Sequence, residues 1–421
     1  MTKRERVKKM LVHWIWFATR QNVSDRMKVE LLRHFQDPEE IYYAREGEFR
    51  HMEGLTEEGM ASLGDKSLQK AESILHRCSR EKLGILTFQD AAYPARLKNI
   101  ADPPLVLYYK GRLPDFDGTP LIGVVGTRHA SAYGLTAAKR LGYQIAKCGG
   151  IVVSGMAAGI DSMAMSGALT AGREVVGVLG CGGDIVYPHS NRPLYGDVEN
   201  YGCILTEFPP GTPPAAWNFP KRNRIISGLS CGVLVVEAPE KSGALITAHQ
   251  ALEQGRDVFV VPGNIDVDSF VGSNRLLREG AIAVSTGWDI LSEYAAIYPD
   301  KITQDAGKVH LTVYPDEVQT TAKVAQKPAL PKKNKAKKPA DDKKVIDNPA
   351  VPTYSDVNKD LSRLSDQERA LMEALSSGER LVDDVIAELE LPAAKVLSML
   401  TILEIKGFVR RLPGKRIALK Q

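Results

Sequence analysis

Three cations crowd the first turn of a predicted helix in the stretch WNFPKRNRIISGL, where Lys221, Arg222 and Arg224 lie close together. The helix is expected over Pro220 to Leu229, with its proline in the first turn, where proline is tolerated, and with Asn218 as a candidate cap. Cations are unfavourable at this end because the helix dipole is positive there. A bound phosphate would offset both the charge of the cations and the positive end of the helix dipole, since helix N-termini and guanidinium groups each favour phosphate oxygens.

Glycine-rich loops are the second feature with phosphate chemistry. Glycine lets backbone N–H groups approach an anion beyond the carboxyl ends of parallel strands. One such loop is weak evidence, but several at one edge, together with Arg128 and the helix cations, predict an anion-binding edge. The loops are GVVGTRHASAYG (123–134), SGMAAGIDS (154–162), LGCGGDIVYP (179–188), EAPEKSGALITA (237–248) and VPGNI (261–265).

The ligand that these loops indicate is a nucleic-acid strand rather than a nucleotide cofactor. The first loop is not GxGxxG, no acidic residue closes a strand about 20 residues later, and no GxxxxGK[ST] motif is present. Trp217, Phe219 and Tyr187 occur in the same loops as the cations. A groove for single-stranded nucleic acid combines cations along the phosphate backbone with aromatic rings that stack on the bases. The sequence therefore predicts such a groove.

The elements that position these residues alternate between apolar strands and helical segments over residues 82–300. Continuous apolar strands with helices between them are typical of a parallel sheet covered on both faces. We therefore expect an α/β fold with an extended, Rossmann-like, doubly wound and mostly parallel sheet. The predicted strands are LVLYY, LIGVVG, GIVVSG, EVVGVLG, CILTE, CGVLVVEA, DVFVV and AIAV, and the predicted helices include Gly134 to Lys147, Ser162 to Ala171 and Leu245 to Gly255.

The N-terminal segment, residues 1–80, has periodic apolar positions and acidic first turns, which predict a helical domain. Its first helix is expected to turn Leu11, Trp14, Ile15 and Phe17 inward. The piece MEGLTEEGMASL places a small-residue turn between two short helices. A turn of this kind resembles that of a helix-hairpin-helix-like or sterile-alpha-motif-like domain, but a plain helical domain is the favoured interpretation.

Two further segments follow the sheet region. Residues 302–360 are rich in Lys, Pro and Asp and poor in core formers, which predicts a flexible linker. Residues 362–421 show three helical patterns and then GFVRRL-PGK-RIAL, two strands around a tight turn, which predicts a winged-helix domain. Its third helix, expected within 392–406, carries few cations, so contact with protein or backbone phosphate is expected rather than base reading. The basic residues lie on the wing, at Arg410, Arg411, Lys415 and Arg416.

Length, net charge and cysteine content limit the classes of protein to which this chain can belong, but they do not identify its function. A chain of 421 residues is expected to hold two or three domains, and its net charge of +4 is too small to indicate a partner. The five cysteines form no CxxC pair, so we expect reduced core residues of a cytosolic protein. The N-terminus imitates a signal peptide, but His13 interrupts the apolar run and no segment is long enough to span a bilayer. A cytoplasmic protein without metal or cofactor is predicted.

Six ordered motifs carry a resemblance to a known family. They are GxxGTR, VSGxAxGID, YPxxN, FPxRNRIIxGLSxxxLVVEA, SGxLITA and GRxVFxVPG. From about residue 84 to residue 285 the chain resembles the DNA-processing protein A (DprA, or Smf) family. The resemblance implies a homodimer that binds and protects single-stranded DNA in natural transformation, loads a RecA-type recombinase onto it, and has no known catalytic activity.

The resemblance also implies the DNA-binding residues. The phosphate-binding arginine of the family falls on Arg128, its RNR motif falls on residues 222–224, and Phe219 takes the aromatic position. Two departures occur: His189 stands where many relatives have lysine, which weakens that contact because histidine is mostly neutral at pH 7, and Met165 stands where many have histidine. The predicted contacts are Gly126, Thr127, Arg128, Ser131, Gly155, His189, Phe219, Lys221, Arg222, Asn223, Arg224, Ser242, Gly243 and Thr247.

Other interpretations stay open on the sequence. Without the other motifs, an ion pair with a carboxylate such as Asp161 or Glu237 would be the favoured explanation of Arg128. Leu276 and Leu277 are either core residues or part of the dimer interface. An enzyme related to the nucleoside-monophosphate phosphoribohydrolases is the main rival, although EKSGALITAHQ lacks the PGGxGTxxE sequence of those sites. A sequence-specific regulator that acts through the winged helix is a third interpretation.

Overall fold

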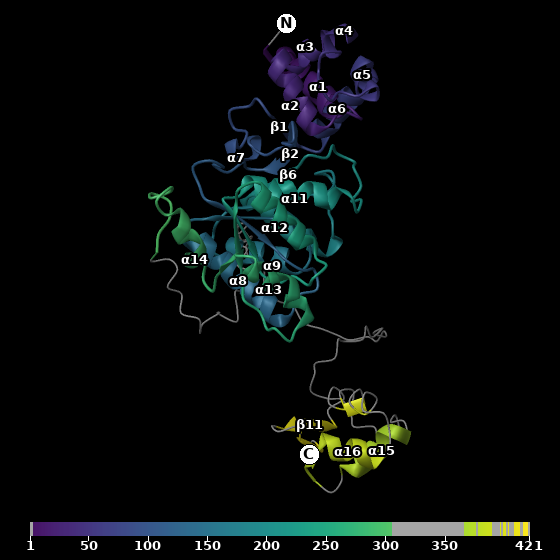
Figure 1. Ribbon diagram of the computed structural model, residues 1–421, viewed down its shortest axis with the longest axis vertical. Coiled ribbons are helices and arrows are strands. Elements are labelled where there is room, and N and C mark those ends of the chain that lie inside the picture. Colours follow the sequence, from purple (N-terminus) through teal and green to yellow (C-terminus); the bar gives the residue numbers. More distant parts are fainter. Residues whose placement is uncertain are drawn as a thin grey trace, which may run out of the picture. The chain divides into compact units, whose positions relative to one another are not determined.

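A computed structural model describes residues 3–304 and, near the C-terminus, residues 366–375, 378–389, 396, 399–400, 403, 408–412 and 416–419. The chain divides into two compact units, Met1–Gln319 and Thr320–Gln421, and each is described by itself (Figure 1). The predicted linker over 302–360 lies outside the described residues from residue 305 onward.

The N-terminal part of the first unit is helical, as predicted. Trp14, Ile15 and Phe17 of the first helix are buried, whereas Leu11 is only partly buried. Side chains begin two of the helices: the Ser24 hydroxyl accepts a hydrogen bond from Met27 N, and the Asp37 carboxylate accepts one from Glu40 N. The helices are α1 (Lys3–Ala18), α2 (Asp25–Phe35), α3 (Pro38–Tyr43), α4 (Glu46–Phe49), α5 (Glu57–Gly64) and α6 (Gln69–Arg80).

A nine-stranded sheet forms the centre of this unit. All eight predicted strands are confirmed, and the short strand β1 (Gly84–Thr87) was not predicted. The others are β2 (Val106–Gly111), β3 (Leu121–Val125), β4 (Ile151–Ser154), β5 (Val175–Val178), β6 (Cys203–Thr206), β7 (Gly232–Val235), β8 (Asp257–Val260) and β9 (Ile282–Ala283). Their order is β1-β2-β6-β5-β4-β3-β7-β8-β9, and within this sheet the β1–β2 and β2–β6 pairs are antiparallel while the other pairs are parallel.

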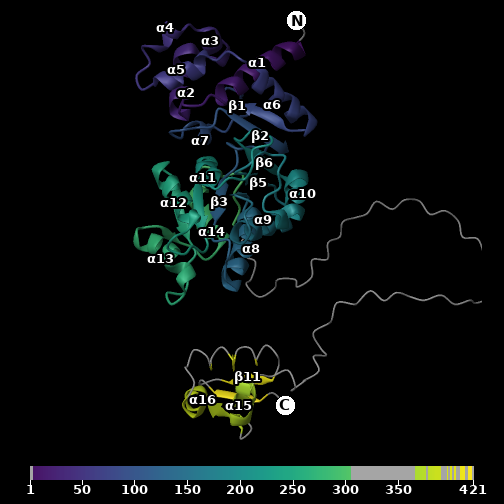
Figure 2. The same ribbon diagram turned by 90° about the vertical axis from the view of Figure 1, so that its right-hand side faces the viewer.

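Both faces of the sheet are buried, which explains the continuous apolar strands. In β3, Ile122 and Val124 pack into one core, whereas Leu121 and Val125 pack into the other. Helices cover each face, and Figure 2 shows the sheet edge-on between them. On one side lie α8 (Ala132–Lys147), α9 (Ile160–Thr170), α10 (Arg192–Tyr201) and α14 (Gly287–Leu291), and on the other lie α7 (Ala95–Lys98), α11 (Asn218–Leu229), α12 (Gly243–Glu253) and α13 (Val271–Arg278).

The helical part and the sheet share a core within this unit. Leu105, Val106 and Tyr108, in and just before β2, are buried in the same cluster as the aromatic residues of α1. Helix α6 ends at Arg80 and strand β1 begins at Gly84. Short 3-10 helices connect other elements: η1 (His189–Asn191), η2 (Asp268–Phe270) and η3 (Ser292–Tyr294).

The strand order reverses direction between β3 and β7. From β3 the chain proceeds outward through β4 and β5 to β6, and it then returns to β7 on the other side of β3. Loops after two neighbouring strands therefore run in opposite directions and leave a crevice at the carboxyl ends, which is where open α/β sheets bind ligands.

The second unit has the winged-helix elements that the sequence predicted. They are α15 (Asp366–Ala374), β10 (Arg380–Leu381), α16 (Val382–Leu389), β11 (Val409–Leu412) and β12 (Arg416–Leu419), with strand order β10-β12-β11. Most of the predicted third helix lies outside the described residues. Val396, Met399, Leu400 and Leu403 are described, and all four are helical and buried. On the wing, Arg410 and Arg416 are exposed, and Lys415 lies outside the described residues.

The five cysteines are free thiols. Cys78, Cys148, Cys181 and Cys203 are buried, and Cys231 is partly buried. Burial raises the pKa of Cys78 to about 12 and the pKa of Cys148 to about 11. The four buried cysteines are therefore neutral core residues, as predicted.

Candidate nucleic-acid interface

A cavity of about 640 Å³ lies at the crevice between β3 and β7. We call it the β3–β7 pocket. Its walls are the loop after β3, the loop between β7 and α12, and the first turn of α11. Nine of the predicted residues line it: Gly126, Thr127, Arg128, Phe219, Arg222, Asn223, Ser242, Gly243 and Thr247.

Arg128 is an exposed cation at this pocket, and its guanidinium carbon lies 5.2 Å from the centroid of the Phe219 ring. In the described residues it forms no ion pair with Asp161 or Glu237. The Asp161 carboxylate accepts hydrogen bonds from the Gly155 and Ala157 N–H groups instead. The ion-pair explanation of Arg128 is therefore wrong, and its charge faces the pocket without a carboxylate partner.

Arg222 is a second cation at the pocket, and it is buried, with 4% of its surface exposed. One of its terminal nitrogens donates to the Val178 carbonyl, while Nε has no partner. Burial lowers the pKa of Arg222 and raises the pKa of Asp161, and the attraction between these two charges opposes both shifts. A guanidinium still keeps its proton under these conditions, so Arg222 supplies positive potential from beneath the pocket wall.

Gly155 acts through Arg222 rather than at the surface. A Cβ atom at this position would lie 2.3 Å from a terminal nitrogen of Arg222. Gly155 does not line the pocket. The absence of a side chain therefore lets the guanidinium lie against the loop after β4, which is a packing role and not a direct ligand contact.

Aromatic rings form one side of the pocket. The ring centroids of Phe219 and Tyr187 are 5.6 Å apart with an interplanar angle of 34°. Tyr187 is 37% exposed and also lines the pocket. Such a half-open aromatic pair offers a flat surface on which a nucleobase can stack.

The N-terminus of α12 forms the opposite wall. The Ser242 hydroxyl caps it by accepting from Ala244 N at 3.2 Å, and Asn223 Nδ2 donates to the Gly243 carbonyl at 3.3 Å. A Cβ at Gly243 would meet no atom within 4 Å, so this helix end is open to a ligand. Lys241, just before the helix, is exposed at the pocket, and the sequence analysis missed it. The signal was present, because the quoted loop EAPEKSGALITA contains this lysine directly before a predicted helix start.

Ser131 and His189 are predicted residues that, like Gly155, lie outside the pocket. Ser131 caps α8 by accepting from Gly134 N at 3.1 Å, and its hydroxyl donates to Glu237 at 2.8 Å. Its only hydroxyl proton is therefore directed at a carboxylate, so Ser131 shapes the loop after β3. His189 is exposed on η1 and does not line the pocket.

The structure corrects the prediction for Arg224. Its side chain is only 4% exposed and all five guanidinium N–H donors have partners. Nε donates to Asp102, one terminal nitrogen donates to Glu207 and to the Lys221 carbonyl, and the other donates to Asp25 and to Glu207. No donor is left for a phosphate.

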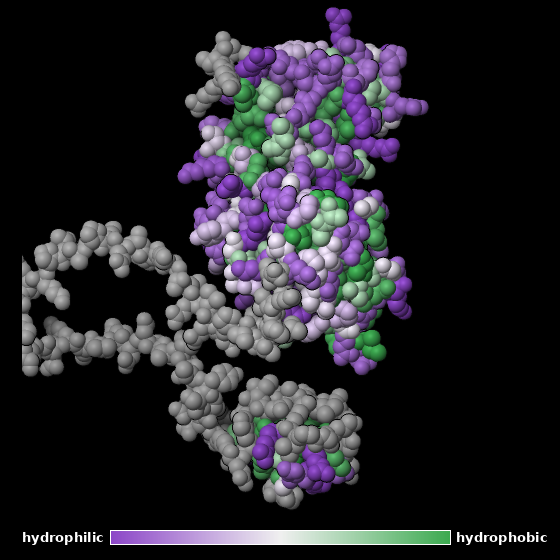
Figure 3. Space-filling model, turned by 90° about the vertical axis from the view of Figure 1, so that its left-hand side faces the viewer, coloured by the Kyte–Doolittle hydropathy of each residue, from purple (hydrophilic) through white to green (hydrophobic). Residues whose placement is uncertain are grey.

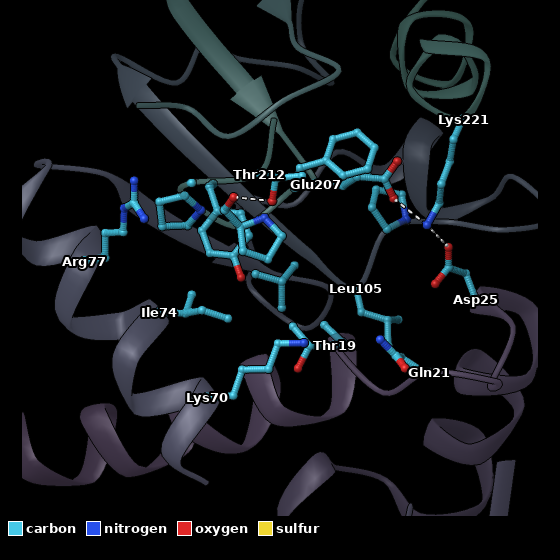
Figure 4. Close-up of a pocket in the computed structure, with 18 of the residues that line it drawn as sticks. Thr19, Gln21, Asp25, Lys70, Ile74, Arg77, Leu105, Glu207, Thr212 and Lys221 are labelled. Atoms are coloured by element: carbon cyan, nitrogen blue, oxygen red, sulfur yellow. Dashed lines mark hydrogen bonds and ion pairs between the residues drawn. The ribbon is translucent and has the colours of Figure 1, made fainter. Parts of the chain in front are cut away.

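Lys221 belongs to the same ion-pair cluster. Its ammonium lies 3.2 Å from Asp25 and 3.3 Å from Glu207, and Figure 4 shows it pointing toward both carboxylates. Its side chain is 48% exposed at the edge of a different cavity, of about 620 Å³. Carboxylates from α2 and from the end of β6 therefore offset these cations, where the sequence analysis expected phosphate.

The pKa values within this cluster follow from the balance of burial and charge. Burial acts to raise the pKa of the Asp25 carboxyl, but the attraction of Lys28, Lys221 and Arg224 outweighs it, so that pKa lies below its ordinary value. Burial acts to lower the pKa of Arg224, but the attraction of the neighbouring carboxylates is larger than this effect, so the pKa of Arg224 lies above its ordinary value. These ion pairs connect α2 of the helical part to α11 at the pocket.

Two further predictions need correction. Asn218 does not cap α11; it is the first helical residue, and its side-chain amide donates to the Pro213 carbonyl instead. Leu276 is 2% exposed and belongs to the core, so it is unavailable for a dimer interface, while Leu277 is partly buried.

Two family models match the chain: DNA recombination-mediator protein A over residues 84–295, and the DprA winged helix domain over residues 358–415. Protein Smf of Synechocystis is 32% identical over 408 residues, which covers 96% of this chain and 97% of that protein. The chain belongs to the DprA/Smf family. DprA of Bacillus subtilis is 41% identical over 224 residues, which covers 53% of this chain and 75% of that protein.

A solved structure also matches. The X-ray structure of DprA from Streptococcus pneumoniae superposes with a TM-score of 0.59 at 33% identity, covering 67% of this chain and 97% of that chain. The family membership and the fold are thus shown by sequence and by structure. Within the described residues, no helix is long and apolar enough to cross a membrane.

Proposed function

We propose that this DprA/Smf member binds single-stranded DNA in the β3–β7 pocket. The observation that carries the proposal is the contact between Arg128, which has no carboxylate partner among the described residues, and the Phe219 ring inside a cavity lined by a helix N-terminus. The cation and the open end of α12 suit a phosphate. The ring suits a base, and every base offers a face for stacking.

A single strand fits this pocket better than a duplex. A base reaches the Phe219 ring only if it leaves its neighbours in the stack, which costs little in a single strand and a few kcal/mol in a duplex. Arg128, Lys241 and the N–H groups near Gly243 contact the backbone, with Arg222 adding charge from behind. Binding is therefore expected to be sequence-tolerant and salt-dependent.

The proposed role is binding rather than catalysis. The carboxylate of the pocket, Asp161, is held by two backbone N–H groups and is buried beside Arg222. This arrangement stabilises a loop and does not offer an exposed base or nucleophile. A nucleotide-processing enzyme is the alternative, and an assay for base release from nucleoside monophosphates tests it: release that depends on Asp161 would establish the enzyme.

A homodimer is the proposed assembly. β9 is the edge strand at this end of the sheet, and Ile282 on it is 39% exposed. Leu252 on α12 is 53% exposed and Val271 on α13 is 40% exposed. Figure 3 shows apolar side chains gathered in patches among polar ones on one face of the molecule. An edge strand with exposed side chains, together with exposed apolar side chains on α12 and α13, supports self-association. Light scattering of the parent and of Ile282→Lys tests it; two monomeric proteins would contradict it.

We also propose that the protein passes bound DNA to a RecA-type recombinase during DNA uptake and recombination, in the cytoplasm. The support is the match to a recombination-mediator model over residues 84–295 and the family resemblance. Reconstitution tests this role: the protein should speed the loading of a RecA-type recombinase onto DNA covered by a single-strand-binding protein. An unchanged loading rate would contradict it.

The decisive experiment for the binding proposal is a salt titration with single-stranded and duplex oligonucleotides of the same sequence. Tighter binding to the single strand, with affinity that falls as salt rises, is expected. Equal or tighter binding to the duplex would contradict the pocket model. It would favour the winged helix as the DNA-binding element instead.

A further inference from the structure

Trp217 differs from the other tryptophans of the chain in its exposure. Trp14 and Trp16 are buried in the N-terminal core and Trp288 is partly buried, whereas Trp217 is 79% exposed. A tryptophan ring carries roughly 150–250 Å² of surface that gains free energy when it is covered. Single exposed apolar residues are common on proteins. The exposure of Trp217 therefore indicates a function only if its position in the fold does so too.

The backbone holds Trp217 in a defined position. It is the N-cap residue of α11, with φ −72° and ψ −16°. Asn218 N donates to the Ala215 carbonyl at 3.0 Å, and Ala215 N donates to the Pro213 carbonyl at 2.9 Å. The Asn218 side chain adds a second bond to Pro213, at 3.2 Å. These bonds fix the turn that leads into α11, so the indole projects into solvent from a fixed backbone.

This position lies at the rim of the β3–β7 pocket. Ala216 and Phe219, the residues on either side of Trp217 and Asn218, both line the pocket, whereas Trp217 does not. Two residues along a helix advance about 3 Å along the axis and turn about 200° around it. Phe219 therefore lines the pocket, whereas the Trp217 side chain leaves the start of α11 on a different side of the backbone and is exposed to solvent.

We propose that Trp217 is a second stacking platform, which takes the nucleobase next to the one that stacks on Phe219. The single strand would then leave the pocket across the N-terminus of α11. This inference rests on the proposed function. Because an indole stacks on any base, the platform lengthens the bound segment without adding sequence preference.

The test uses the full-length protein and an oligothymidylate at fixed salt. Trp217→Ala is expected to weaken binding roughly 5- to 150-fold, the effect of losing one stacked base, and to leave the dependence on salt unchanged. Trp217→Phe should recover most of the affinity, because it keeps an aromatic face. Tyr201→Ala is the matched control: Tyr201 is 70% exposed on α10 and does not line the pocket, so its loss should change nothing.

Tryptophan fluorescence gives an independent readout. Binding should quench the emission of the parent, and in Trp217→Phe the quenching should largely disappear because the other three tryptophans lie away from the strand. Parental affinity in Trp217→Ala, with losses in Arg128→Ala and Phe219→Ala, would overturn the platform and leave the proposed function intact. Weak binding in Trp217→Ala together with a lowered Tm and no quenching in the parent would mean a structural role, which also overturns it. If the parent itself fails to bind single strands, the proposed function fails first.

Discussion

The guanidinium of Arg128 lies over the ring of Phe219, with 5.2 Å between the guanidinium carbon and the ring centroid. One residue comes from the loop after β3 and the other from the first turn of α11, so the contact exists only when the sheet brings these loops together. Stacking of this kind orients the guanidinium without using its N–H donors. The N–H donors of Arg128 thus remain available for a phosphate.

Arg128 is expected to act through charge. Arg128→Ala should weaken binding about equally for unrelated single strands and reduce the slope of log affinity against log salt by about 0.7, the increment for one phosphate. Arg128→Lys should keep the slope and lose part of the affinity, because lysine lacks the planar fork. Arg50→Ala, which removes a 70%-exposed arginine far along the chain, is the control. An unchanged slope in Arg128→Ala would rule out the phosphate contact.

Phe219 is expected to act through its ring. Phe219→Ala should cost on the order of 1–3 kcal/mol of binding free energy and leave the salt slope nearly unchanged. Phe219→Leu keeps much of the apolar volume without an aromatic face, so it should resemble Phe219→Ala in affinity and the parent in stability. If Phe219→Leu binds like the parent, then packing and not stacking explains the residue.

Gly155 is expected to matter through Arg222. In Gly155→Ala the new Cβ would lie 2.3 Å from the Arg222 guanidinium, so the buried side chain must move and lose its bond to Val178. The expected cost is about 1–3 kcal/mol of stability, with weaker DNA binding. Gly196→Ala in α10 is the matched control because its Cβ meets no atom within 4 Å, and alanine in a helix should be neutral or stabilising. Equal Tm values for the two variants would contradict this account.

Arg224 is expected to stabilise the fold and not to contact DNA. Arg224→Met should lower the free energy of unfolding by about 3–5 kcal/mol, since it leaves buried carboxylates without their partner. At a temperature where the variant is folded, the salt slope of DNA binding should equal that of the parent. A stable variant with a flatter slope would restore the phosphate role that the sequence suggested. Chemical unfolding and the binding titration measure the two quantities.

The Asp25 carboxylate gives the pH dependence of the same cluster. Because its pKa in the folded protein lies below the unfolded value near 3.8, its ionised form contributes stability that is present above that value and lost as pH falls through the folded pKa. At pH 7 Asp25→Asn should be less stable than the parent by about 1.5–3 kcal/mol. The difference should shrink below about pH 4. If the stability difference between the parent and Asp25→Asn stays constant between pH 7 and pH 3, then the charge of Asp25 does not contribute to stability.

Much of the architecture followed from the sequence. The strand LIGVV is apolar at every position because both faces of the sheet are covered, and a run of that kind is visible without coordinates. The glycine loops and the arginine at 128 likewise indicated an anion site, since the chemistry of glycine backbones and guanidinium groups is local. The strand β1 was missed because Gly84–Thr87 is short and only half buried along its length.

The tertiary structure alone decided what each cation does. Residues 221, 222 and 224 lie within four positions of the sequence, yet the helix turns them toward different surroundings. Arg222 lies at the pocket, whereas Lys221 and Arg224 contact Asp25 and Glu207. Asp25 is almost 200 residues away in the chain, so no local pattern connects it to α11. Sequence specifies charge and spacing, whereas the partner of a charge depends on which distant segment the fold packs beside it.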